Sequence, residues 1–147
     1  MKTRTLVMAG MMALTAMAST RVAQAQEPLV VNIPFDFVAG NTQMPAGEYS
    51  VKTLGPTNAM ILIARKDSAA SAFINTNAAV ASEPKTESKL IFDRYGDRYF
   101  LSQVWTAGNA CGRQLLKSTR EKEMAQTVKL ENQGQVTLVA SLARTNR

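Results

Sequence analysis

Carboxylates are the residues of this 147-residue chain that come closest to catalytic chemistry, because histidine is absent. The commonest general base and metal ligand is therefore missing, which excludes Ser-His-Asp and Cys-His catalysis. Asp36, Glu48, Asp93 and Asp97 could supply the acid and the nucleophile of a glycosidase-type hydrolase. We expect Asp97 in a turn, where a solvated charge is ordinary, and Asp93 next to Arg94 in a strand, where charges commonly pair across strands. Neither carboxylate then needs a catalytic role. We therefore predict no catalytic residues and keep a carboxylate hydrolase as the weakest alternative.

Other reactive side chains give no stronger signal. Lys117 and Ser118 are neighbours, as a Ser-Lys hydrolase could use, but Ser118 to Glu121 fits a helix capping box. Cys111 is the only cysteine, so an intramolecular disulfide is excluded. We expect it to be a small buried residue, with a reactive thiol or an intermolecular bridge as alternatives. Zinc-ligand spacing and phosphate-binding loops are absent from the sequence, so we expect no metal site and no cofactor.

A duplicated Asp-Arg-Tyr triplet, at residues 93–95 and 97–99, could bind a ligand instead. Such a polar and aromatic rim suits glycans or peptides. The alternative, which routine pairing of charges across strands favours, is the charged outer face of a hairpin whose other face is core. The candidate ligand or partner surface consists of Arg94, Tyr95, Asp97 and Arg98.

The segment that carries both triplets, residues 90–105, predicts a β-hairpin. Gly96-Asp97 between aromatic and β-favouring runs is typical of a two-residue type II′ turn. This turn pairs Tyr95 with Arg98, Arg94 with Tyr99, and Phe92 with Leu101. The register predicts one shared inward face, formed by Leu90, Phe92, Tyr99, Leu101 and Trp105. Because large inward aromatics dominate the energetics of a core, the hairpin should anchor the core of the domain.

Elsewhere, apolar residues recur mainly with a period of two, which is typical of strands buried on one face. Residues 31–37 alternate in this way, and Pro34 should place that strand at an edge or end it. Further strands are expected at residues 48–52, 60–63 and 72–76. A short helix should follow at residues 119–125. The last element should be a hairpin, with strands at 128–130 and 136–142 around a turn at 131–134.

About eight short strands and one short helix near the C-terminus predict a mainly β fold, either an antiparallel β-sandwich or a small barrel. An outer-membrane barrel is the rival, and it needs strands of about 9–11 residues with aromatic girdles at both interfaces. Most of the strands expected here are shorter, and the aromatic residues are clustered. The prediction is therefore a soluble β domain.

The first 25 residues have the pattern of a cleavable signal peptide. Lys2 and Arg4 precede an apolar core at residues 6–18, and Ala23-Gln24-Ala25 fits a signal-peptidase site. This pattern predicts a single β-rich domain at residues 26–147, periplasmic or secreted, that does not span a membrane after cleavage. Without Lys2, Arg4 and Arg21 the chain has 14 basic and 11 acidic residues, a net charge of +3. So mild an excess gives no support for nucleic-acid binding.

Three motifs carry a resemblance. They are the strand at residues 31–37 (Val-Asn-Ile-Pro-Phe-Asp-Phe), the turn at 44–51 (Met-Pro-Ala-Gly-Glu-Tyr-Ser-Val), and the hairpin from Tyr95-Gly96 to Trp105. In this order, after a signal peptide, they resemble a group of uncharacterised small exported bacterial β-rich proteins. The resemblance covers nearly all of the mature chain and implies one exported β domain. The group has no assigned activity, so the resemblance implies no functional residue.

The leading functional hypothesis is a non-catalytic binding or structural module of the cell envelope, with an envelope component or an anionic glycan as partner. The alternative is a lipocalin-like barrel that carries a small hydrophobic ligand in its interior. The two differ in the inward side chains, which either interdigitate as a core or line a cavity. The residues that decide are Phe35, Phe37, Tyr49, Phe92, Leu101 and Trp105.

Overall fold

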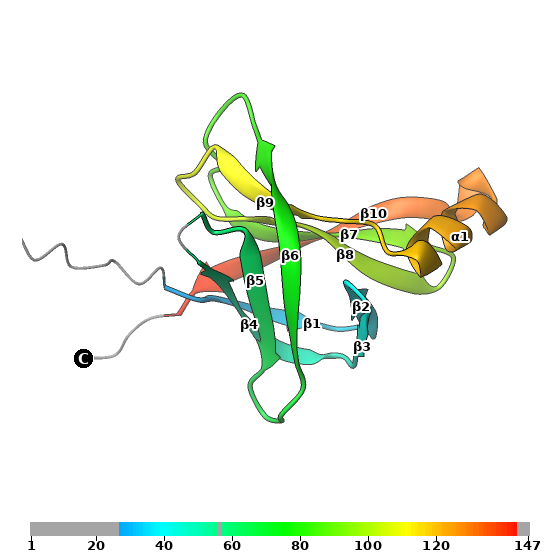
Figure 1. Ribbon diagram of the computed structural model, residues 1–147, viewed down its shortest axis with the longest axis horizontal. Coiled ribbons are helices and arrows are strands. Elements are labelled where there is room, and N and C mark those ends of the chain that lie inside the picture. The colour runs from blue at the N-terminus through cyan, green and yellow to red at the C-terminus, as the bar shows by residue number, and fades with distance from the viewer. Residues whose placement is uncertain (1–26, 56, 144–147) are drawn as a thin grey trace, which may run out of the picture.

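The computed structural model describes residues 27–55 and 57–143. The signal peptide and its cleavage site, expected within the first 26 residues, lie outside the described part. The described chain is mainly β, with one α-helix near the C-terminal end (Figure 1). The mainly β fold class predicted from the sequence is therefore confirmed.

Eight strands close into an antiparallel barrel. Around the ring the order is β8-β7-β10-β1-β4-β5-β6-β9, and pairing of β9 with β8 completes the closure. Their bounds are β1 Leu29–Ile33, β4 Gly47–Leu54, β5 Met60–Arg65, β6 Ser71–Val80, β7 Ser88–Tyr95, β8 Arg98–Trp105, β9 Cys111–Leu115 and β10 Gln133–Leu142. Of the two architectures that the sequence left open, the structure has the barrel. β1 ends at Ile33, directly before Pro34, as a residue without a backbone N–H requires.

A short hairpin packs against the barrel between β1 and β4 in the chain. Strands β2 (Phe37–Ala39) and β3 (Thr42–Met44) pair with each other, and β2 runs parallel to β8. Phe37 and Met44 are buried in the same core as the barrel strands. At the tip, a Cβ atom on Gly40 would lie 3.5 Å from the side chain of Ile74 in β6. The hairpin thus reaches from β8 across to β6.

Aromatic rings pack against one another in the core of the barrel. Phe37 meets Tyr49 and Phe92 edge to face, with centroid distances of 5.2 and 5.4 Å. Phe35 stacks on Tyr99 and also contacts Phe92. Leu101 is buried in the same cluster. These members of the inward set interdigitate, as the core hypothesis requires.

Trp105, predicted on the inward face, is buried on the outer face instead. The hairpin has the predicted pairs up to Phe92–Leu101, but Ile91 then pairs with Gln103, so Ser102 is an extra residue in β8. Such a bulge reverses the alternation beyond it. Val104 therefore joins the barrel core, and the indole packs against Gly112, where a Cβ atom would lie only 2.6 Å from the ring.

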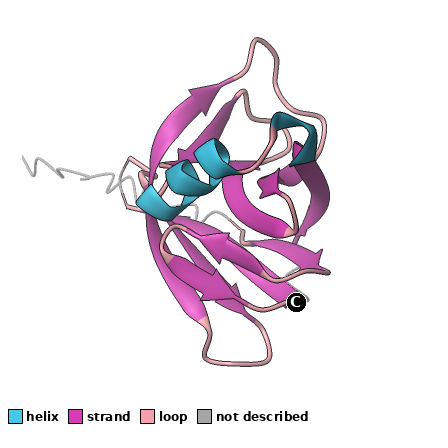
Figure 2. Ribbon diagram, turned by 90° about the vertical axis from the view of Figure 1, so that its right-hand side faces the viewer, coloured by secondary structure: helices cyan, strands magenta, loops and turns pink. Residues whose placement is uncertain are grey.

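Helix α1 (Thr119–Thr127) covers part of the outer face of the β7–β8 hairpin (Figures 1 and 2). Its N-cap is Ser118, whose hydroxyl accepts a hydrogen bond from the Glu121 amide at 3.1 Å. The predicted N-cap at Ser118 is therefore confirmed, whereas the Glu121 carboxylate accepts from the Tyr95 hydroxyl instead of closing a capping box. The helix is two residues longer than predicted. Under the helix, a second apolar cluster forms from Val38, Tyr95 and Phe100 against Met124, Ala125 and Val128.

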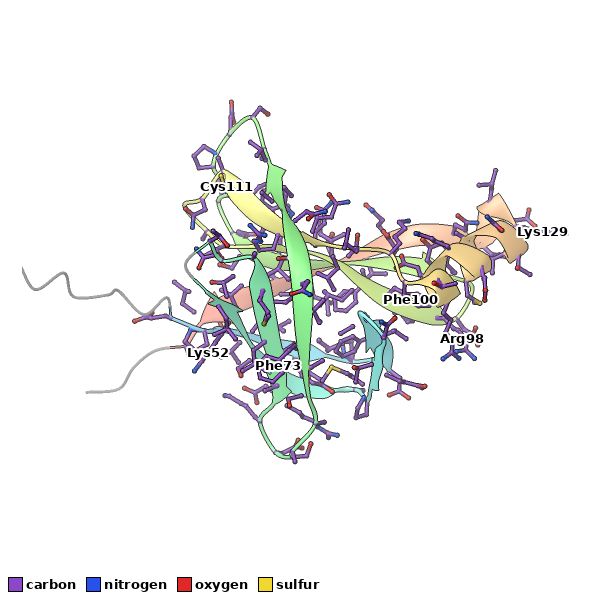
Figure 3. The ribbon with its side chains drawn as sticks, viewed as in Figure 1. Lys52, Phe73, Arg98, Phe100, Cys111 and Lys129 are labelled. Atoms are coloured by element: carbon purple, nitrogen blue, oxygen red, sulfur yellow. The ribbon has the colours of Figure 1, made fainter. Side chains whose placement is uncertain are left out.

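Two further expectations are wrong. Residues 128–130 form no strand, because α1 is followed by a 3-10 turn at Leu130–Asn132 and β10 pairs with β7 and β1. Cys111 is exposed, not buried. It pairs with Val80, which is 77% exposed, where the β6–β9 ribbon extends beyond the packed core. Figure 3 shows Cys111 at the end of the molecule away from Arg98.

Candidate functional site

The two Asp-Arg-Tyr triplets line two different grooves. Residues 93–95 contribute to a groove of about 440 Å³, hereafter the first groove, together with residues of β8, β9, β10 and the segment before α1. Residues 97–99 contribute to a groove of about 280 Å³, the second groove, together with residues of β2, β3 and α1. The turn between the triplets, at Gly96, separates the two sites along the chain.

A cluster of ionisable side chains lies between the first groove and helix α1. The ammonium of Lys117 donates to the Tyr95 hydroxyl at 2.9 Å, and this hydroxyl donates to Oε1 of Glu121 at 3.2 Å. Lys117 Nζ also lies 3.5 Å from Oδ2 of Asp93 and 3.9 Å from Oε1 of Glu121. Asp93 and Glu121 are both buried, so one partly exposed ammonium faces two buried carboxyl groups.

Burial and hydrogen bonding shift the pKa values of three groups in this cluster. Removal from water raises the pKa of the Glu121 carboxyl above its ordinary value, although Lys117 and the Tyr95 hydroxyl act in the opposite direction. Burial likewise raises the pKa of Tyr95. The hydrogen bond to Tyr95 raises the pKa of Lys117, because it stabilises the charged ammonium. At neutral pH the tyrosine is therefore a neutral phenol and the lysine is charged.

The rest of the first groove is mostly uncharged and polar. Ser102, Gln103, Gln114, Gln133 and Gln135 contribute to its lining. The Gln135 side-chain amide donates to Oδ1 of Asp93 at 2.9 Å, and the Trp105 indole donates to Oε1 of Gln103 at 2.8 Å. Gln133 donates to the carbonyls of Ala125 and Val128, which fixes the end of α1. Several of these side chains are thus held in one orientation.

The second groove combines two arginines with two aspartates. Arg98 at the start of β8 and Arg120 in the first turn of α1 are exposed, and neither forms an ion pair within residues 27–55 and 57–143. Asp36 accepts a hydrogen bond from the Ala46 amide at 2.8 Å, and Asp97 is exposed in the turn. Tyr99 completes the lining on the β8 side.

The four residues predicted as a surface do not lie together. Tyr95 is only 4% exposed, because its ring is part of the cluster under α1. Arg94 is half-buried, and Asp97 and Arg98 are exposed at the hairpin end. Asp97 and Arg98 share the second groove, while Arg94 and Tyr95 belong to the first. The hairpin register places Tyr95 and Arg98 directly opposite each other, and helix α1 then covers one and leaves the other open.

The four candidate carboxylates are likewise divided. Glu48 pairs with Lys66 at 2.6 Å on the surface, and Asp93 belongs to the buried cluster. Asp36 and Asp97 line the second groove together. Sequence reasoning considered Lys117 only as part of a Ser-Lys pair and missed Glu121 and Arg120, because it explained their segment by helix capping. The available signal was the concentration of charge around that cap, at residues 117–123.

Comparisons with protein-family models, with curated proteins and with solved structures find no match. Among the residues that the structure describes, no helix is long and apolar enough to cross a membrane. The same residues contain no group of three or more Cys, Asp or Glu side chains that could hold a metal ion. The functional conclusion therefore depends on the grooves themselves.

Proposed function

We propose that this chain is an exported, non-catalytic β-barrel domain that acts as a binding module of the cell envelope and takes an anionic glycan in the second groove. The observation that carries the proposal is the pair Arg98 and Arg120. Both guanidinium groups are exposed in one groove, without an ion pair within the described residues. Guanidinium groups suit carboxylate and phosphate groups because they can donate two parallel hydrogen bonds.

The aspartates of the same groove fit an acidic sugar better than a simple anion. Asp97 can accept hydrogen bonds from sugar hydroxyls, and Asp36 retains one oxygen beyond the one that the Ala46 amide occupies. Tyr99, whose ring stacks on Phe35 with a centroid distance of 3.9 Å, lines the same groove. A ligand that carries both an acid group and hydroxyls uses all of these features.

The lipocalin-like carrier is the second candidate, and the closed eight-stranded ring favours it. It requires a cavity inside the barrel that is lined by the inward set. The packing of Phe37 against Tyr49 and Phe92 supports a filled core instead. A hydrolase would rest on Asp36 and Asp97, which share a groove, and release of reducing ends from a polysaccharide would reveal it.

Calorimetric titration of residues 26–147 with an acidic polysaccharide, polygalacturonate, and with an uncharged one, dextran, tests the proposal. We expect binding of the acidic polymer alone, weakened by salt because charges are screened. The double variant Arg98→Ala/Arg120→Ala should lose binding. A control that removes equal charge elsewhere, Lys52→Ala/Lys122→Ala, should retain most of it. Equal loss in both double variants would contradict a specific groove.

Export is tested separately. The N-terminal pattern supports cleavage after Ala25, and the resemblance to exported bacterial proteins agrees with it. Mass spectrometry of the periplasmic fraction and of the medium should find a mature chain that begins at Gln26. Full-length chain retained in the cytoplasm would contradict export.

A further inference from the structure

The first groove has the construction of a binding site in its own right. Its polar side chains lie on the outer faces of neighbouring strands, and the register brings them together. Gln103 of β8 pairs with Gln114 of β9, and Asp93 of β7 pairs with Gln135 of β10. Side chains in such directly opposite pairs lie about 5 Å apart at their Cβ atoms. The groove therefore presents one continuous polar strip across four strands.

Hydrogen bonds fix the orientation of two glutamine side chains in this strip. The Trp105 indole holds the carbonyl oxygen of Gln103, which leaves the amide group of Gln103 without a partner in the described chain. Asp93 holds the amide group of Gln135, which leaves the Gln135 carbonyl oxygen without one. Ser102, only 9% exposed, forms no side-chain hydrogen bond within residues 27–55 and 57–143. Groups fixed in this way lose little conformational entropy when a ligand binds.

The charge of the groove favours an uncharged ligand. Lys117 lies 3.5 Å from Asp93, so these two charges already compensate each other. Arg94 also lines the groove, but side chains alternate along a strand, so the Arg94 side chain leaves β7 on the face opposite to Asp93 and Tyr95. The groups that remain available to a ligand are both donors and acceptors: the amide group of Gln103, the carbonyl oxygen of Gln135 and the hydroxyl of Ser102. Sugar hydroxyls both donate and accept, and therefore match such a mixture.

We propose that the first groove is a second binding site and that it takes an uncharged saccharide. A peptide is the competing ligand, since its backbone also donates and accepts. Peptides that bind sheets usually add a strand at a free edge, and the strands of this groove belong to a closed barrel without such an edge. Apart from the buried Tyr95 and from Gly134, the lining residues are polar or charged, so the groove offers little to apolar peptide side chains.

This inference rests on the proposed function only in assuming that glycans are the ligands, because the two grooves share no lining residue. If both proposals hold, the domain binds acidic and neutral sugar units of one polymer on the two sides of the β7–β8 turn.

The test is a titration of ¹⁵N-labelled residues 26–147 with two uncharged trisaccharides, maltotriose and triacetylchitotriose. At least one should shift the side-chain amide signals of Gln103 and Gln114 at millimolar concentration. The double variant Gln103→Ala/Gln114→Ala should weaken this binding at least tenfold. The control Asn75→Ala/Gln126→Ala removes two exposed amides elsewhere and should leave it unchanged.

Three outcomes would overturn the inference: no shift with either sugar, shifts that the Gln103/Gln114 variant does not weaken, or shifts with the dipeptide acetyl-Ala-Ala-amide alone. The Arg98→Ala/Arg120→Ala variant separates the two proposals. It should still bind the neutral trisaccharide, and loss of that binding would contradict an independent first groove. If the second-groove proposal alone is wrong, polygalacturonate does not bind, while the neutral trisaccharide still does.

Discussion

The hydroxyl of Tyr95 donates a hydrogen bond to Glu121 across 3.2 Å, and this contact joins the barrel to the buried residue of helix α1. The same hydroxyl accepts from Lys117, so it contacts both the segment before the helix and the first turn of the helix. Beneath α1, this hydrogen-bonded contact lies beside the apolar cluster of Val38, Tyr95 and Phe100 with Met124, Ala125 and Val128.

Tyr95→Phe should therefore destabilise the domain. The substitution keeps the ring but leaves Glu121 without its donor, and loss of a partner to a buried charged group costs about 1–3 kcal/mol. Tyr99→Phe is the matched control, because no hydrogen bond involves the Tyr99 hydroxyl among the described residues. Urea unfolding of both variants beside the parent measures the difference. Equal unfolding midpoints in all three proteins would show that the contact contributes nothing.

Glu121 should make stability depend on pH. Its pKa is raised in the folded state by burial, so the folded chain binds more protons than the unfolded chain between the two pKa values. Stability from this group is then present at low pH and is lost as the pH rises through the folded pKa. Glu121→Gln removes the titration while it keeps an acceptor for Tyr95. The difference in unfolding free energy between variant and parent should change in favour of the variant from pH 4 to pH 8, and a constant difference would contradict the assignment.

The aromatic core should be sensitive to truncation. Phe92 is fully buried and contacts both Phe35 and Phe37 edge to face. Phe92→Ala removes this ring and leaves a cavity, which should cost about 3–5 kcal/mol. Arg98→Ala, on the exposed outer side, should change stability by no more than about 0.5 kcal/mol. Denaturation of the two variants checks the contrast, and a Phe92→Ala protein as stable as the parent would disprove the core assignment.

The β7–β8 turn should require glycine at position 96 because of its backbone conformation, and not because a side chain would lack space. Gly96 has a φ of +64°, and a Cβ atom there would meet nothing within 4 Å. Gly96→Val should cost about 1–3 kcal/mol, since a β-branched residue is strained at positive φ. Gly96→Asn should cost less, because asparagine tolerates this region. If thermal unfolding ranks the two variants in the opposite order, the turn conformation is wrong.

Local patterns predicted much of this fold, and long-range packing explains the rest. The Gly96-Asp97 turn, its register up to Phe92–Leu101 and the Ser118 cap follow from turn and cap chemistry within a few residues. The bulge at Ser102 turns Trp105 outward onto Gly112 of β9, and no pattern within the hairpin predicts this contact with a later strand. The candidate site follows the same division. The triplets were visible in the sequence. Only the docking of α1 buries Tyr95 and places Arg120 in the same groove as Arg98.

Chemical-shift mapping tests the central claim, that ligands bind on the outside of a filled barrel, most directly. A short oligogalacturonate should be titrated into the ¹⁵N-labelled domain. We expect shifts at Arg98, Arg120 and the neighbouring amides of the second groove, while interior residues such as Ile61 and Ile63 keep their signals. A parallel titration uses an apolar ligand, a fatty acid. If the fatty acid alone causes shifts, and the largest are at Ile61, Ile63 and Phe92, the account is contradicted and the protein is an interior carrier.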